Sequence, residues 1–79
     1  MKQVLTDIAK AIVDAPELVV VTEREEGDNV FLELMVSADD MGKVIGKRGK
    51  IANAIRTVVK ATATKDNKRV IVNIVSDAE

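Results

Sequence analysis

The chain has 79 residues and a mass of 8.6 kDa, which is the size of one small domain. Apolar residues make up 47% and charged residues 32%, a balance typical of a folded globular chain, and the net charge of −1 excludes a uniformly basic or acidic protein. Cysteine and histidine are both absent, which excludes disulfides, thiolate or imidazole catalysis, and zinc sites built from those side chains.

The first half of the chain predicts a helix followed by a hairpin of two strands. Residues 3–14 carry apolar side chains at helical spacing, and Pro16 is expected to end that helix. Residues 18–25 are rich in β-branched side chains and are too short for a helix, so they predict a strand. Residues 26–29 supply a turn, and the alternation over 30–36 predicts the second strand.

The second half predicts two helices and a last strand. A short helix is expected over about residues 38–45, a longer one over about 49–62, and a strand over 69–75. Ser37 is followed three residues later by Asp40, which indicates a capping arrangement at the start of the short helix.

The order α-β-β-α-α-β predicts an α+β fold with a three-stranded mixed sheet. Two strands joined through a helical connection are expected to be parallel, with a right-handed crossover, whereas the first two strands form an antiparallel hairpin. Three strands in a chain of this size cannot bury both faces of their sheet. We therefore expect all three helices to pack on one face.

Charge is distributed unevenly along the chain. Residues 1–40 carry a balance of −7, whereas residues 41–69 carry a balance of +8. A basic block in a nearly neutral protein indicates a local anion-binding surface. A solvated helix face rich in lysine and arginine gives the same count, so charge alone leaves both interpretations open.

Two glycines flank two basic residues in Gly46-Lys47-Arg48-Gly49, the segment that joins the two predicted helices. Glycine lets a ligand backbone approach closely, and the helix after Gly49 presents unpaired N–H groups and the positive end of its dipole. Lys47 and Arg48 add full positive charges at the same place. The segment predicts a loop that grips a sugar–phosphate backbone and reads no base itself; a Gly-x-x-Gly that serves only as a helix turn is the alternative.

Other glycine motifs do not fit. A phosphate-binding P-loop requires Gly-x-x-x-x-Gly-Lys followed by Ser or Thr, but Gly42 and Gly46 are one residue too close and Arg48 follows Lys47. The dinucleotide-binding fingerprint requires Gly-x-Gly-x-x-Gly directly after a strand, and these glycines follow a predicted helix with spacings of four and three.

The segment from Val44 to Ile55 resembles the KH-domain signature, and the element order resembles the type II KH fold over essentially the whole chain. At this length the chain resembles the small single-KH bacterial RNA-binding proteins of the KhpA type. The resemblance implies one KH domain over residues 1–79 and a groove that takes about four nucleotides of single-stranded RNA. It also implies an RNA chaperone or post-transcriptional regulator that is not an enzyme and has no cofactor, metal or small-molecule substrate. Expected partners are a second copy, as a homodimer, or a second KH protein of the KhpB/Jag type, as a heterodimer.

The resemblance also assigns roles to individual residues around the loop. Gly46, Lys47, Arg48 and Gly49 are expected to clamp the phosphates, and Ile45 and Ile51 to support the loop and line the floor of the groove. Lys43, Lys50 and Arg56 are expected to enlarge the positive field, and Ile55 to belong to the apolar floor and core.

Two further functions are alternatives to RNA binding. The first is a protein-interaction adaptor whose groove is idle. The apolar arc of the last helix is wider than packing on a sheet requires, so the excess either lines the groove or forms an interface, for which the flank of Ala54, Val58 and Ala61 is the candidate; short side chains that tolerate the boundary are the other explanation. The second is an enzyme or nucleotide-binding protein, against which the absence of histidine, cysteine and a P-loop argues; the neighbouring carboxylates Asp39 and Asp40 could serve a metal or acid–base chemistry, but the capping arrangement already accounts for them.

The single aromatic residue, Phe31, cannot build the base-stacking platforms of other RNA-binding folds, which favours KH-type recognition. The longest aliphatic run, residues 18–21, is far too short to span a bilayer, and the first residues do not resemble a signal peptide. We therefore expect a cytoplasmic protein that does not contact a membrane.

Overall fold

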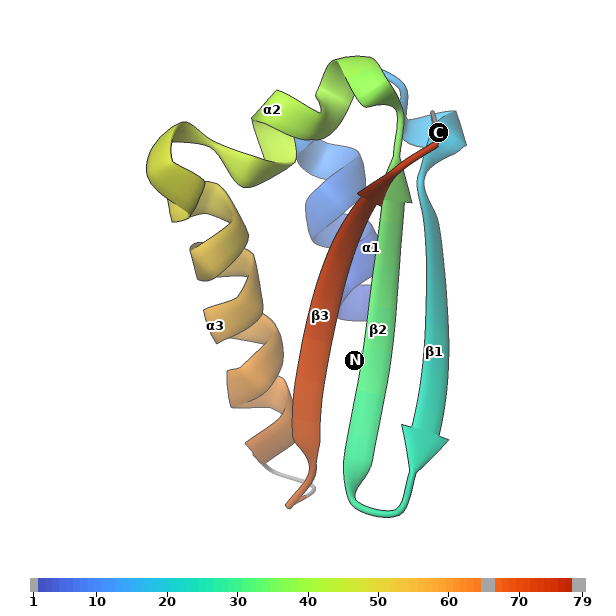
Figure 1. Cartoon of the computed structure of the whole chain (residues 1–79), viewed down its shortest axis with the longest axis vertical. Helices are drawn as coiled ribbons and strands as arrows, with labels where there is room; N and C mark the ends of the chain where they lie inside the picture. Colours follow the sequence, from blue (N-terminus) through green and yellow to red (C-terminus); the bar gives the residue numbers. More distant parts are fainter. Residues whose placement is uncertain (1, 65–66, 78–79) are drawn as a thin grey trace.

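In the computed structural model, which describes residues 2–64 and 67–77, three helices lie on one side of a three-stranded sheet (Figure 1). The helices are α1 (Lys2–Ile12), α2 (Met41–Ile45) and α3 (Lys50–Thr64), and the strands are β1 (Val20–Glu26), β2 (Asn29–Val36) and β3 (Arg69–Ser76). Single 3₁₀ turns occur at Pro16–Leu18, Ala38–Asp40 and Lys47–Gly49.

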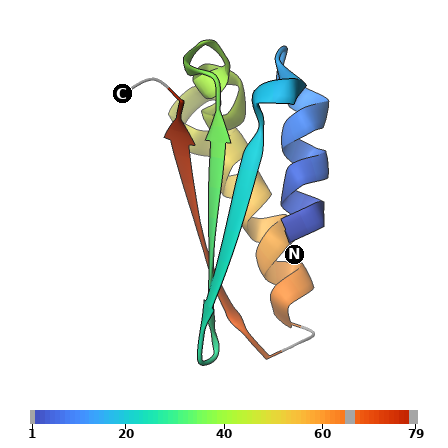
Figure 2. The ribbon, with the colours of Figure 1, turned by 90° about the vertical axis from the view of Figure 1, so that its right-hand side faces the viewer.

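The sheet has the order β1-β2-β3 and is mixed, as the sequence predicts. Strands β1 and β2 form an antiparallel hairpin in which Val20 pairs with Met35, and β2 and β3 run parallel. Figure 2 shows the helices gathered on one side of the sheet, which confirms the predicted α+β layer arrangement; no helix of residues 2–64 or 67–77 covers the opposite face.

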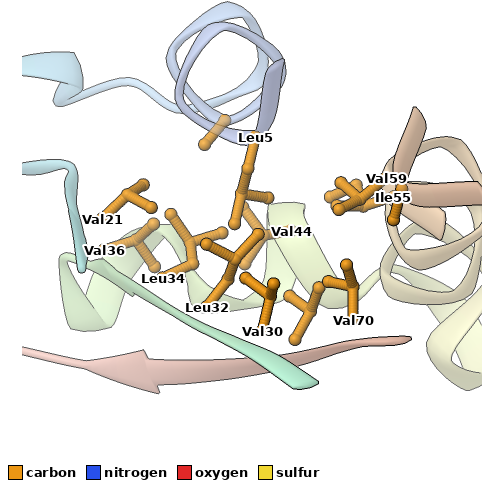
Figure 3. Packing of buried hydrophobic residues seen from close by; sticks show 13 residues of the cluster. Leu5, Val21, Val30, Leu32, Leu34, Val36, Val44, Ile55, Val59 and Val70 are labelled. Carbon is orange, nitrogen blue, oxygen red and sulfur yellow. The ribbon is translucent and has the colours of Figure 1, made fainter. Parts of the chain in front are cut away.

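The core lies between the sheet and the helices. Alternate residues of β2 point into it, and Val30, Leu32, Leu34 and Val36 are each at most 1% exposed. Side chains from all three helices meet them there, and Figure 3 shows this cluster from close by. Each such aliphatic side chain contributes about 1.5–3 kcal/mol when fully buried. Because α2 and α3 both pack into this core, their positions fix where the loop that joins them lies.

Element boundaries differ from the sequence expectations by two or more residues in four elements, and the first is α1, which ends at Ile12, two residues earlier than expected. The first strand begins at Val20 because Pro16–Leu18 forms a 3₁₀ turn, with proline at the first turn position that its fixed φ suits. The helix expected over 38–45 is a 3₁₀ turn followed by the five-residue α2. Helix α3 begins at Lys50 and continues to Thr64. Among the described residues, no helix is long and apolar enough to cross a membrane.

Candidate nucleic-acid interface

The Gly46–Gly49 loop is a tight, exposed turn between α2 and α3 (Figure 1). Its backbone has positive φ at Gly46 (72°), Arg48 (57°) and Gly49 (73°). Gly46 N–H donates to the carbonyl of Gly42, which closes α2, and Gly49 N–H donates to the carbonyl of Gly46. The exposed side chains of Lys47 and Arg48 form no hydrogen bond or ion pair within the described part of the chain. Their charges are therefore available to a ligand.

Gly46 is fixed by both its conformation and its surroundings. A Cβ placed at Gly46 would lie 2.6 Å from Cγ1 of Ile51, closer than any van der Waals contact allows. Its φ of 72° and ψ of 179° also lie in a region that only glycine adopts readily. Ile51 therefore packs directly against the loop backbone at Gly46.

Ile51 also lines an apolar hollow. This hollow has a volume of about 290 Å³ and lies between α1 and α3. It is lined by Ile8, Ile12, Ile51, Ala54, Ile55 and Val58. Ala54 and Val58, two residues of the predicted partner flank, belong to it, and Val58 is 48% exposed. Ala61 is exposed but does not line it.

The predicted cap at Ser37 and Asp40 is wrong. Ser37 makes no side-chain cap bond to the backbone; its hydroxyl donates instead to Oδ2 of Asp40, 3.1 Å away. The Asp40 side chain is 2% exposed and accepts hydrogen bonds from the backbone N–H of Asp14 (3.1 Å) and Ala15 (3.1 Å). Asp40 thus joins the end of α1 to the start of α2, because two N–H groups after α1 have no other acceptor as strong as a carboxylate.

These interactions shift the pKa values of Asp40 and Lys43. The hydrogen bond from Asp14 N–H, with those from Ala15 and Ser37 and the charge of Lys43, holds the pKa of Asp40 below its usual value despite burial. Lys43 forms an ion pair with the Asp14 carboxylate, and its Nζ lies 4.0 Å from Oδ1 of Asp40. The hydrogen bond to the Asp14 carboxylate raises the pKa of Lys43. The charge of Lys43 is therefore paired at the surface with the Asp14 carboxylate, and it adds less to the positive field of the loop than an unpaired lysine would.

The remaining predicted residues lie on both sides of the loop. Ile45, at the end of α2, is 37% exposed, and Lys50 is exposed at the start of α3. Arg56 donates from Nε to the carbonyl of Val72, at 3.2 Å, so it bridges α3 and the outer edge of β3. Ile55 is 3% exposed and belongs to the core, as expected.

A second basic surface, which no local motif of the sequence predicts, lies at the end of α3 opposite to the loop. There a cleft of about 420 Å³ is lined by Lys60, Ala63, Lys68, Arg69 and Val70. Lys68 donates to Oε2 of Glu25 at 2.7 Å. These cations belong to the basic block of the sequence, but only the tertiary structure brings the end of α3 beside the start of β3.

Comparisons with known proteins agree with this geometry. A family model described as the KH domain of KhpA/KhpB matches residues 2–74. The chain is 57% identical over 75 residues to the RNA-binding protein KhpA of Clostridium acetobutylicum and to that of Clostridium perfringens, covering 95% of this chain and 100% of each relative. It is 53% identical over 75 residues to the RNA-binding protein KhpA of Caldanaerobacter subterraneus, with the same coverage.

One solved structure has the same fold. It is the crystal structure of Era in complex with MgGDPNP and nucleotides 1506-1542 of 16S ribosomal RNA, and it superposes with a TM-score of 0.59 at 14% identity. The match covers 95% of this chain and 29% of the Era chain.

Proposed function

This chain belongs to the KhpA/KhpB KH-domain family, and we propose that it is a single KH domain that binds single-stranded RNA through the Gly46–Gly49 loop. The observation that carries the proposal is the loop itself. It is exposed, its backbone is held in glycine conformations, and its two basic side chains have no partner within the described part of the chain.

Each residue of the loop has a separate task in this proposal. Gly46 and Gly49 leave no side chain between the loop and the sugar–phosphate backbone, so the phosphates approach the first N–H groups of α3. Lys47 and Arg48 supply the charge that attracts those phosphates, and Lys50 extends the same field by one residue. Base identity is read elsewhere, since the loop presents only backbone and positive charge.

The groove of this proposal runs along α3 from the loop toward the second basic cleft. Helix α3 has 15 residues and is therefore about 22 Å long. A path of that length suits the roughly four nucleotides that a KH groove takes. Arg56 lies midway, and its guanidinium already binds the β3 edge, so it acts as a wall of the groove more than as a phosphate ligand.

The same proposal includes a cellular role in RNA regulation and association with a second KH domain. A single groove holds few nucleotides, so an RNA chaperone or post-transcriptional regulator of this size gains affinity when two grooves act together. The apolar hollow between α1 and α3 supports such pairing, with a second copy or with a KhpB-type KH protein in the cytoplasm. The same hollow favours the alternative function, an adaptor that pairs with KH proteins and binds little RNA itself. Both functions are binding functions, without catalysis.

The test is a binding titration of single-stranded RNA with the double variant Lys47→Asp, Arg48→Asp. Two attractive charges become repulsive where the phosphates approach, so we expect affinity to fall by more than about tenfold at fixed salt. The matched control is Lys2→Asp, Lys10→Asp, which changes the net charge equally on the exposed face of α1. If both double variants lose the same affinity, the loop is not the RNA site.

Salt dependence separates RNA binding from the adaptor function. If the loop and its neighbours neutralise about three or four phosphates, log K should fall with log[salt] with a slope of about −2 to −3. A flat dependence contradicts a phosphate clamp and favours the adaptor.

A further inference from the structure

The sheet face that carries no helix has an ordered pattern of its own. Alternate residues of each strand point away from the core, and the strand register places them in rows across the sheet. The rows are Val20–Met35–Val75, Thr22–Glu33–Asn73 and Arg24–Phe31–Ile71. We call these three rows the open face. One polar row with a carboxylate at its centre therefore lies between two rows that are mostly apolar.

The apolar rows are accessible to a partner. Val20 is 50% exposed, and Phe31, Met35, Ile71 and Val75 are only half-buried. Phe31 is the single aromatic residue of the chain, and it lies on this face instead of in the core. Exposed apolar side chains gathered in rows on one face of a small domain indicate an interaction site, whereas apolar residues scattered singly over a surface do not.

The middle row supplies a polar socket between these apolar rows. A hollow of about 240 Å³ opens on the open face, and its charged lining residues are two carboxylates, Glu23 and Glu33, and one guanidinium, Arg24. The exposed carboxylate of Glu33 forms no hydrogen bond or ion pair with a described residue. Arg24 is already engaged, because its guanidinium lies 4.9 Å from the centre of the Phe31 ring and 3.2 Å from the carboxylate of Glu26. The socket is therefore negative and suits a basic side chain.

Two other occupants are disfavoured by the same carboxylate. A second copy that packs its open face on this one by a two-fold axis through the middle row would bring two Glu33 carboxylates together, and like charges that face each other are destabilising. RNA phosphates would meet the same negative charge, with apolar side chains on either side. The occupant that fits is a different protein segment, with a cation between two apolar groups.

We propose that the open face is a docking surface for an amphipathic helix of another protein, whose lysine or arginine pairs with Glu33 between two apolar residues, each one turn away. Neighbouring rows are two residues apart along a strand, which is about 6.7 Å. Residues four apart along a helix are separated by about 6 Å. A helix laid along β2 therefore places its residues i, i+4 and i+8 over the three rows in turn, and it covers the second face of the sheet as layered folds do.

The test titrates the ¹⁵N-labelled full chain with an alanine-based helical peptide carrying Leu, Lys and Leu at positions i, i+4 and i+8. The matched peptide has Glu in place of Lys. We expect the lysine peptide to shift the amide signals of Phe31, Met35 and Ile71, and to bind at least about tenfold more tightly than the glutamate peptide.

Variants of the protein complete the test. Glu33→Lys should reverse the preference between the two peptides, Glu33→Gln should abolish it, and Glu17→Lys, which makes the same charge change in the exposed turn before β1, should leave it intact. The glutamine variant removes the charge without adding a new one, so it keeps the result interpretable if the lysine variant melts early.

Several results would overturn the proposal. These are equal binding of the two peptides, no binding of either, and shifts confined to the hollow between α1 and α3. An RNA oligonucleotide that shifts the open-face signals would also overturn it by assigning the surface to RNA. The peptide titration uses the parent loop throughout, whereas the RNA titration changes Lys47 and Arg48. Failure of this proposal and failure of RNA binding are therefore distinguishable.

Discussion

The two ends of helix α2, which is five residues long, are built in opposite ways. At its start, the buried carboxylate of Asp40 binds two backbone N–H groups and the Ser37 hydroxyl, and Lys43 pairs with Asp14 beside it. At its end, Lys47 and Arg48 extend from the surface. The charges at the start of α2 are paired within the protein, whereas those at its end are available to a ligand.

This difference teaches that charge in a small domain contributes to the fold only where it is desolvated and hydrogen-bonded. Three hydrogen-bond donors take the place of water around the Asp40 carboxylate. Loss of this carboxylate would therefore leave the backbone N–H groups of Asp14 and Ala15 without their acceptor. Exposed charges such as Lys47 contribute little to stability, and their substitution changes mainly what the surface attracts. The backbone at the Gly46 end of α2 is an exception, because Gly46 is constrained by its conformation and its packing even though the charges beside it are exposed.

The largest effect on stability should come from Gly46→Ala. The new Cβ would overlap Ile51, and its φ of 72° is unfavourable for alanine, so we expect a loss of about 2–4 kcal/mol. The matched control is Gly42→Ala, one helical turn earlier, where a Cβ meets nothing within 4 Å and φ is not positive. That change should stabilise α2 by about 0.5–1 kcal/mol. Urea denaturation measures both, and equal effects would contradict the described packing of the loop.

A smaller loss is expected for Asp40→Asn. The amide keeps the shape but accepts only one of the two backbone hydrogen bonds well, and it removes the charge opposite Lys43. We expect the melting temperature to fall by about 5–10 °C. RNA affinity, measured where the variant is fully folded, should stay within about twofold of the parent. A large loss of RNA affinity without a change in melting would mean that the two ends of α2 are not separable.

Lowering the pH should destabilise the fold through the Asp40 end of α2 and not through the loop. The pKa of Asp40 is lowered in the folded state, so its stabilising contribution is present above its usual value of 3.8 and is lost as the pH falls through the lower folded value. We expect the urea midpoint of the parent to decline below about pH 4, and that of Asp40→Asn to decline less steeply over the same range. Parallel declines would show that other carboxylates account for the acid sensitivity.

The smallest stability change should follow Lys47→Asp, Arg48→Asp. Both side chains are exposed, so the free energy of unfolding should change by no more than about 0.5 kcal/mol while RNA binding is lost. Thermal melting beside the RNA titration measures this contrast. An early melting transition would contradict the separation between a structural and a ligand-binding end.

Much of the fold could be predicted from the sequence because its signals are local. The alternation of Val30 to Val36, the helical spacing before Pro16 and the glycines around the loop each act within a few residues. The loop was recognisable for the same reason, since all four of its residues are contiguous.

What escaped prediction depends on distant pairs. Asp40 looked like a cap because Ser37 stands three residues before it, but its backbone partners lie 25 and 26 residues away. The basic cleft beside Lys60 and the rows of the open face likewise exist only once β3 lies parallel to β2. No local pattern specifies that register, which follows from how the core closes.

The contact between Gly46 and Ile51 also sets how this loop can change over evolutionary time. Any other residue at 46 must overcome its backbone conformation and the isoleucine together, so a single substitution there meets two obstacles at once. Position 47 meets neither obstacle and position 48 meets only the constraint of its positive φ, because both side chains are exposed. Descendants of this sequence can therefore retune the charge of the loop one step at a time, and with it the strength of anion binding, while the backbone that presents those charges is inherited unaltered.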